Sequence, residues 1–205
     1  YSKSSSIGGS MSTIKLNAAS GGGSVAFEGP ASLGTDKVIK FPTAPGVIIQ
    51  TVQHVKTDTS SFSIDSGATH NDTNFAASIT PTTTNSKILI QIMVNHGTSS
   101  NQIGAFNLMC NSSTIDAVKG DTSSSRARLT GCHHAEETAG TQTIYVGFLH
   151  SPASTSQQTY TLQWRHNSSS TRTHYINRSH DDNDASGNGM GPRAASTIIL
   201  QEVAT

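Results

Sequence analysis

Lys87-Ile88-Leu89-Ile90-Gln91-Ile92-Met93-Val94 is a dense apolar stretch, and it decides the fold class. Every second residue from Ile88 to Val94 is β-branched. β-Branched side chains fit a pleated surface better than a helix, because their restricted χ1 angles suit an extended backbone. The stretch therefore predicts a central β-strand.

Strand patterns continue on both sides of this segment, from Val47 to the C-terminus. Val47–Lys56, Thr141–His150 and Thr159–His166 alternate apolar and polar residues with a period of two. Weaker strand patterns occupy Phe62–Asp65, Ala76–Thr80, Ile103–Cys110, Thr114–Val118, Arg126–His134, Arg172–Asn177 and Thr197–Val203. About nine or ten strands at this spacing, without helical periodicity, predict an all-β sandwich resembling a jelly roll.

Some strands allow finer expectations. Ile144, Val146 and Phe148 should share one face, and so should Leu162, Trp164 and His166. Arg172–Asn177 is expected to pair back on Thr159–His166. The apolar strand that ends within three residues of the C-terminus is expected to lie in the middle of a sheet.

Residues 11–46 have a different pattern, in which Thr13–Leu16, Ser24–Phe27 and Lys37–Phe41 are separated by breaks rich in Ala, Ser and Gly. Each stretch has too few apolar residues to be stable alone. We expect a stalk in which several chains bury these residues together. The residues expected in that oligomeric core are Ile14, Leu16, Val25, Phe27, Ile39 and Phe41.

The expected domains follow from these patterns. Pro42–Gly46 combines prolines and a glycine, which close the stalk. Residues 11–46 are then the stalk or attachment segment, and residues 47–205 are the sandwich head. Residues 1–10 precede Met11 and are expected to be a disordered or added leader without a functional role.

Composition argues against several partners. The formal net charge is zero, the pI is about 7.3, and the 13 Lys and Arg residues are scattered, so nucleic acid is not an expected partner. No apolar run approaches the length of a membrane span, and no secretory signal is evident. Cys110 and Cys132 are expected to be free thiols.

No motif gives a positive reason to expect an enzyme. Asp65-Ser66-Gly67-Ala68 matches the short signature of an aspartic protease, but a polar segment follows it and the tetrapeptide is favourable for a turn. The nine histidines show no zinc spacing, and Asp181–Asp184 lacks the pattern of a calcium loop. We therefore expect no catalytic residue, metal or cofactor.

Two long polar loops remain as candidates for recognition, Lys119–Arg128 and Arg178–Arg193. Binding residues are often found on loops held by a rigid scaffold. The candidate receptor-binding residues on or next to these loops are Arg126, Arg128, Tyr175, His180, Asp181, Asp182 and Asp184.

Several short phrases resemble bacteriophage tail-fibre and fibre-head proteins, especially those of phages of marine bacteria and cyanobacteria. They are Met11–Leu16, Phe41–Gly46, Ile49–Gln53, Ile79–Pro81, Ser86–Ile90, Ile176–Arg178 and Ser196–Val203. The resemblance covers most of residues 11–205. It implies a homotrimer whose N-terminal segment attaches to other virion proteins and whose head meets a host surface glycan or protein. It also implies a location on the virion, at the tail or capsid surface, after assembly in the host cytoplasm.

Three other functions stay open at this point. A capsid-decorating or fibre-adaptor protein would share the architecture without binding a receptor. A lectin-like or tumour-necrosis-factor-like head would be expected to carry a secretory signal and a disulfide. A depolymerase would need facing carboxylates in a cleft.

Overall fold

The computed structural model describes residues 13–17, 24–28, 45–99, 102–135, 138–184 and 191–205. The chain divides into two units, Tyr1–Pro42 and Thr43–Thr205. The strand expected at Lys37–Phe41, with Ile39 and Phe41, lies outside the described residues.

In the first unit, β1 (Thr13–Asn17) pairs antiparallel with β2 (Ser24–Glu28). Ile14 lies opposite Phe27, and Leu16 lies opposite Val25. Residues two apart on a strand share a face, as do directly opposed partners, so this register places all four positions on one face of the hairpin. Their burial between several chains stays a prediction.

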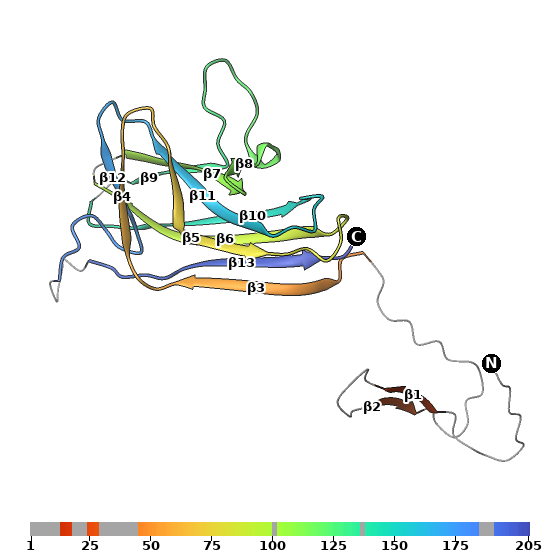
Figure 1. The fold of residues 1–205 in the computed structure, drawn as a ribbon. Helices are drawn as coiled ribbons and strands as arrows, with labels where there is room; N and C mark the ends of the chain where they lie inside the picture. The colour runs from red at the N-terminus through yellow and green to blue at the C-terminus, as the bar shows by residue number, and fades with distance from the viewer. Residues whose placement is uncertain (1–12, 18–23, 29–44, 100–101, 136–137, 185–190) are drawn as a thin grey trace, which may run out of the picture. The chain divides into compact units, whose positions relative to one another are not determined.

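The head consists of two antiparallel sheets (Figure 1). The first, called the β6 sheet here, has the order β3-β13-β6-β12-β4, and β10 also pairs with β6. Its strands are β3 (Ile48–Lys56), β4 (Ser60–Ile64), β6 (Lys87–Thr98), β10 (Gln142–His150), β12 (Arg172–Ile176) and β13 (Ser196–Val203). β6 is thus the central strand that its β-branched run predicts.

The second sheet, called the β11 sheet here, has the order β5-β11-β7-β8, and β9 also pairs with β7. Its strands are β5 (His70–Ile79), β7 (Gln102–Cys110), β8 (Ser113–Thr114), β9 (Gly131–Ala135) and β11 (Gln158–His166). The described residues include no α-helix, only the single-turn 3-10 helix η1 (Asp116–Val118), and no helix among them is long and apolar enough to span a membrane. The predicted all-β sandwich is confirmed.

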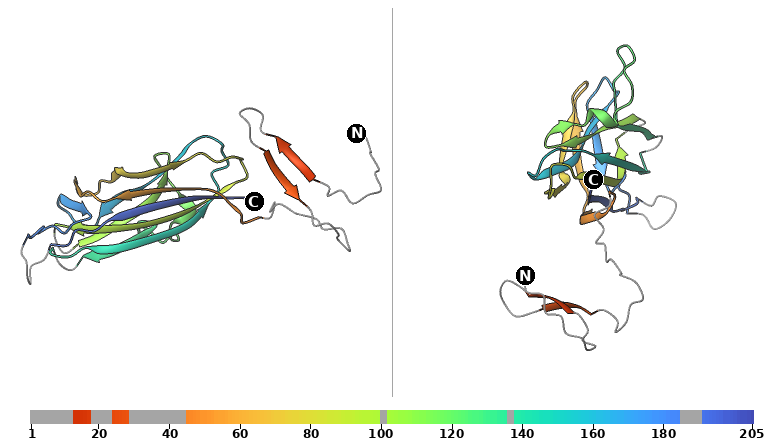
Figure 2. Two further views of the ribbon diagram at one scale, coloured as in Figure 1. Left: turned by 90° about the horizontal axis from the view of Figure 1, so that it is seen from below. Right: turned by 90° about the vertical axis from the view of Figure 1, so that its right-hand side faces the viewer.

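The core lies between the two sheets, which Figure 2 shows from two further directions. Ile88, Ile90, Ile92 and Val94 of β6 are fully buried, as their period of two predicts. Leu162 and Trp164 of β11 are also fully buried in this core, and His166 shares their buried face. Each such apolar side chain stabilises the fold by about 1.5–3 kcal/mol relative to an exposed position.

The last strand lies in the middle of its sheet, as expected. β13 hydrogen-bonds to β3 on one edge and to β6 on the other. Ile198 and Leu200 point into the core and are fully buried. The C-terminal strand is therefore part of the central structure of the head.

The expected pairing of β12 with β11 is wrong. β12 pairs with β4 and β6 instead. The two edges of β11 are occupied by β5 and β7, so no edge remains for a third strand. Strand patterns give the elements, but they do not show which edges are free.

Three other strand expectations need correction. Thr114–Val118 is not a strand: β8 ends at Thr114 and η1 follows, because Asp116 and Lys119 bond to each other locally. Only Gly131 onward of Arg126–His134 is a strand. β5 begins at His70, within a segment expected to be a loop, where the His70 ring stacks on Phe62 with centroids 4.0 Å apart.

Two smaller expectations are confirmed. Asp65–Ala68 forms a turn, in which the Ala68 amide donates to the Asp65 carbonyl at 3.0 Å and Gly67 adopts a φ of +75°. Such a φ suits glycine, which has no Cβ to clash. Cys110 and Cys132 are free thiols, and Cys110 ends β7.

Three histidines form a hydrogen-bonded chain at one end of the core. His96 of β6 contacts His133 of β9 at 2.6 Å and His174 of β12 at 2.9 Å, and its ring stacks on Trp164. Gly104 of β7 makes room, because a Cβ there would lie 2.5 Å from His133 Nε2. The chain links the two sheets with polar contacts.

Candidate functional site

The two loops singled out from the sequence leave the head at different places. The loop of residues 119–130 connects η1 to β9, and residues 177–195 connect β12 to β13. In Figure 1 the first loop projects away from the sheets at a different place from the described ends of the second. The structure therefore does not bring the two groups of candidate residues into one site.

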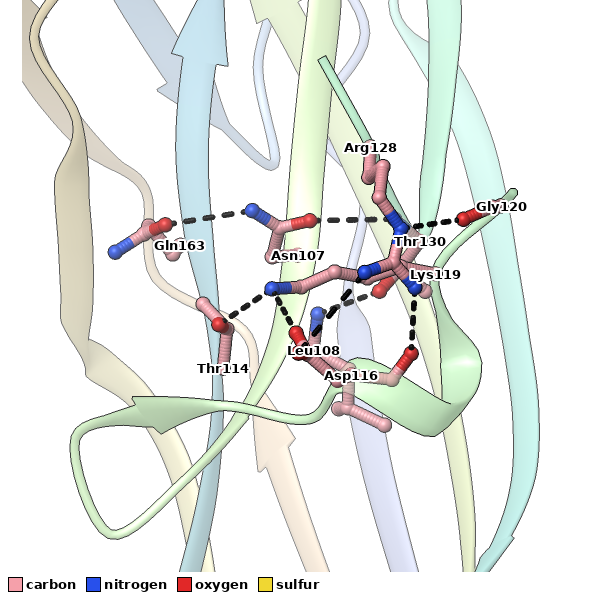
Figure 3. A network of polar contacts seen from close by, with 9 residues as sticks. All are labelled: Asn107, Leu108, Thr114, Asp116, Lys119, Gly120, Arg128, Thr130 and Gln163. Atoms are coloured by element: carbon pink, nitrogen blue, oxygen red, sulfur yellow. Dashed lines mark hydrogen bonds and ion pairs between the residues drawn. The ribbon is translucent and has the colours of Figure 1, made fainter. Parts of the chain in front are cut away.

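The foot of the 119–130 loop is held by a polar network (Figure 3). Lys119 Nζ donates to Thr114 Oγ1 and to Asp116 Oδ1, each at 2.6 Å. Arg128 donates through Nε to the carbonyl of Gly120 at 2.8 Å, and its Nη1 lies 4.0 Å from Asp116 Oδ2. Arg128, a predicted binding residue, thus closes the two ends of the loop onto each other.

Asp116 is the acceptor at the centre of this network. The hydrogen bond and charge of Lys119, followed by the charge of Arg128, lower the pKa of its carboxyl group below the ordinary value. Its side chain is largely exposed. An ionised, accessible carboxylate at this position can accept hydrogen bonds from hydroxyl groups of a ligand.

The other end of the loop is tied to the β11 sheet. The Leu108 amide donates to Thr130 Oγ1 at 2.9 Å, and the Thr130 amide donates to Asn107 Oδ1 at 3.3 Å. Asn107 Nδ2 in turn donates to Gln163 Oε1 at 3.4 Å. These contacts fix the base of the loop on β7 and β11.

Arg126 lies near the tip of the loop. Its side chain donates to Ser123 Oγ at 2.8 Å, and its backbone amide donates to the Ser123 carbonyl at 3.1 Å. Both contacts stay within one turn, and Arg126 is exposed. It is thus accessible to a partner, whereas Arg128 is engaged in holding the loop.

A pocket of about 460 Å³ lies at the foot of this loop, between β8, η1 and the end of β10. It is lined by Cys110, Ser113, Thr114, Ile115, Asp116, Ala117, Phe148, Leu149, His150 and Ser151. His150 Nδ1 lies 2.9 Å from the Tyr160 hydroxyl, and partial burial lowers the pKa of the imidazole. The neutral ring, the hydroxyls and the aromatic Phe148 are groups that contact sugars and small polar ligands.

In the second loop, two arginines converge on Asp182. Arg193 Nη2 lies 2.8 Å from the Asp182 carboxylate, and Arg178 Nη1 lies 3.6 Å from it. Arg193 Nη1 also donates to Thr59 Oγ1 at 3.3 Å. Asp182 therefore acts as the anchor between the two ends of the loop, whose backbones form an isolated bridge at Arg178 and Arg193.

The structure brings Tyr175, His180 and Asp181 close to this anchor. Arg178 stacks over the Tyr175 ring at 4.2 Å, and His180 meets the same ring edge-on with centroids 5.5 Å apart. Tyr175 is only 8% exposed, so a sugar can stack on it only if Arg178 moves. Asp184 is exposed on the same loop.

His180 and Asp181 form an accessible pair. His180 Nδ1 lies 2.8 Å from Asp181 Oδ1, and Thr138 Oγ1 donates to Asp181 Oδ2 at 3.0 Å. The hydrogen bonds from His180 and then Thr138 lower the pKa of Asp181. The pair ties the loop to the segment before β10, at Thr138.

Sequence reasoning missed several residues that line the pocket or anchor the second loop. Asp116 and His150 were not singled out, because they lie 34 residues apart and meet only through the fold. Arg178 and Arg193 were named only as loop ends, although both contact Asp182. Among the described residues, no group of three His, Cys, Asp or Glu side chains is arranged to hold a metal ion.

Comparisons with known proteins add little. No protein-family model and no curated protein matches the chain. The solved structure of infectious bursal disease virus, Gx strain, aligns with a TM-score of 0.38 and 13% identity over 83% of this chain and 43% of that chain. The VP2 subviral particle of infectious bursal disease virus aligns with a TM-score of 0.33 and 13% identity over 89% of this chain and 47% of that one. The chain thus spans less than half the length of either.

Proposed function

We propose that this chain is a structural protein of a tailed-phage virion, a homotrimeric tail fibre or fibre tip whose head binds a glycan or protein on the host surface. The observation that carries the proposal is the division into a β-sandwich head and a separate N-terminal unit with a two-stranded hairpin. The short phrases shared with fibre proteins fall on both units. The N-terminal segment attaches the chain to other virion proteins.

The 119–130 loop and the pocket at its foot are the proposed contact with the receptor. The loop is tied at both ends, so its tip with Arg126 is presented at low entropic cost. The pocket offers a carboxylate, an imidazole, hydroxyls and an aromatic ring. Three tethered copies of a weak site bind a surface with many receptors far more tightly than one copy does.

Binding of the labelled full chain to bacterial cells tests this proposal. We expect retention on cells of a susceptible strain and at least tenfold weaker retention for Arg126→Ala and for Ser151→Arg, which places a bulky charged side chain on the lining of the pocket. Arg165→Ala, on the outer face of the β11 sheet, is the matched control and should bind as the wild type does. Wild-type protein that assembles into virions but binds no susceptible cell would favour the adaptor function instead.

A further inference from the structure

The exposed apolar side chains of the head gather on one sheet. The large apolar residues that are at least two-fifths exposed are Ile48, Ile49, Val55, Met93, Tyr145 and Leu149. All six belong to β3, β6 and β10 of the β6 sheet. Single exposed apolar residues are ordinary, but a group on one surface indicates an interaction site.

Strand register places four of these residues, Val55, Met93, Tyr145 and Leu149, on one continuous surface. One row across β3, β13, β6 and β10 consists of Val55, Thr197, Met93 and Tyr145. The next rows consist of Gln53, Ile199, Gln91 and Gly147, and of Thr51, Gln201, Leu89 and Leu149. Alternate residues of these strands are buried or half-buried toward the core, so the twelve point outward and define the outer face of the β6 sheet.

The outer face of the β6 sheet has an unusual lack of charge. None of its twelve residues is charged, although the chain has 13 acidic and 13 basic residues. Lys87 follows only in the next row, with Val203 and Ile48. Glutamine amides and threonine hydroxyls both donate and accept hydrogen bonds, so an identical face can satisfy them without like-charge repulsion.

The outer face of the β11 sheet is different, and the contrast indicates which face meets water. Its polar side chains bond to one another across the strands: Ser78 to Thr159 at 2.8 Å, and Gln163 to Asn71 at 3.0 Å. None of the six exposed large apolar residues lies there. The polar groups of the β11 sheet's outer face hydrogen-bond to one another, whereas the outer face of the β6 sheet is apolar and uncharged. The outer face of the β6 sheet is therefore the one suited to contact with a partner.

The size of the surface fits a contact between heads that the N-terminal segment is also proposed to hold together. Strands about 4.8 Å apart and same-face residues about 6.8 Å apart give about 400 Å² for the four strands and three rows. Three such faces turned toward one axis remove about 1,200 Å² from water in total, which a trimer shares among its three pairs of heads. Gln91 Nε2 donates to the Tyr145 hydroxyl at 3.2 Å, which holds the most exposed of the six apolar side chains in place.

We propose that the outer face of the β6 sheet is the surface through which the head packs against other copies of this chain. The inference rests on the proposed homotrimer and identifies where its head subunits meet. The trimer would then be held at two places, the N-terminal segment and this face of the head. Tyr145 and Met93, directly opposite each other in the register, lie at the apolar end of the surface.

Light scattering of the full chain over a dilution series tests the proposal. Met93→Lys and Tyr145→Lys each add a charge to the face, and both side chains are exposed enough to leave the core intact. Asn71→Lys adds the same charge to the outer face of the β11 sheet and serves as the control. Circular dichroism confirms folding, and Tyr145→Lys decides the matter if Met93→Lys does not fold.

We expect a trimer for the wild type and for Asn71→Lys, and dissociation at a concentration at least tenfold higher for Met93→Lys and Tyr145→Lys. If the variants dissociate at the same concentration as the wild type, this inference is wrong. The homotrimer would then be held together at another surface. The same result is expected if a different kind of partner covers this face. A monomeric wild type would contradict both the inference and the proposed function.

Discussion

The carboxylate of Glu202 accepts hydrogen bonds from both the amide and the hydroxyl of Thr82, each at 2.6 Å. Glu202 is fully buried on β13, and Gln50 of β3 donates to its other oxygen at 2.6 Å. Burial alone would raise the pKa, but the hydrogen bonds from Thr82, Ser86 and Gln50 outweigh it and lower the pKa to about 2. One ionised side chain therefore joins two strands to the connection between β5 and β6.

This relationship predicts acid sensitivity. Because the folded pKa lies below the unfolded value of 4.5, the stabilisation is complete above about pH 4.5 and is lost as the pH falls toward 2. Glu202→Gln should lower the free energy of unfolding by about 2 kcal/mol at pH 7, since it removes charged hydrogen bonds. It should also make the free energy of unfolding depend less on pH between about pH 4.5 and 2. Urea unfolding at several pH values measures both effects. An unchanged free energy of unfolding in the variant would contradict this role.

The histidine chain predicts a second, higher pH range. Burial, and then the neighbouring histidines, lower the pKa of His96 well below 6.5, and burial also lowers that of His133 to about 4 and of His174 to about 3. The lowered pKa values mean that the folded protein favours the neutral imidazoles. Their contribution to stability is therefore complete above pH 6.5 and is lost as the pH drops toward 4. Each histidine that stays neutral contributes a slope of up to about 1.4 kcal/mol per pH unit.

The histidine chain is tested with His133→Gln, whose amide can donate to His96 or accept from it. We expect the slope of the free energy of unfolding against pH, between pH 6.5 and 4, to decrease by up to about 1.4 kcal/mol per pH unit relative to the wild type. His134→Gln is the control, because His134 lies exposed on the other face of β9. A slope identical in His133→Gln and wild type would show that His133 does not titrate with folding.

Asn177 predicts a large local effect on stability. It is fully buried with a φ of +64°, its amide group donates to the carbonyls of Lys56 and Asp58, and its Oδ1 accepts from Ser196. Asn177→Ala leaves these partners unpaired and puts alanine at a left-handed φ that asparagine tolerates better, so we expect a loss of about 3 kcal/mol or more. Asn167→Ala, at an exposed position, should change the melting temperature little. Similar melting temperatures of the two variants would contradict the conclusion that the hydrogen bonds of Asn177 stabilise the connection between β12 and β13.

The two arginines of the 119–130 loop should behave differently. Arg128→Ala removes the contacts to Gly120 and Asp116, so the backbone amides of the loop should exchange with solvent several-fold faster. Arg126→Ala should leave exchange unchanged outside its own turn, because its contacts stop at Ser123. Hydrogen exchange with mass spectrometry measures both. Equal effects of the two substitutions would argue against a loop that Arg128 closes.

Much of the sandwich was predictable from local pattern. β6, β10, β11 and β13 each carry a period of two, and burial of alternate residues follows directly from it. The pairing of β12 was not predictable, because it depends on which strand edges remain open. η1 was missed because bonds between Asp116 and Lys119 override a weak strand pattern.

The candidate site was harder to predict, for a geometric reason. The loops were recognisable from their polar composition, but the roles of their residues depend on partners distant in sequence. Arg128 and Tyr175 were chosen as binding residues, yet Arg128 closes its loop and Arg178 covers Tyr175. In the histidine chain, His133 and His174 lie 37 and 78 positions after His96, so no spacing pattern in the sequence predicts their contacts.

The solution mass of the full chain tests the central claim most directly. Light scattering at micromolar concentration should give three times the 21.4 kDa mass of one chain. That result would support a fibre whose head and N-terminal segment both associate. A mass of one chain at every concentration would contradict the homotrimer, and with it the proposed fibre function and the proposed interface on the β6 sheet.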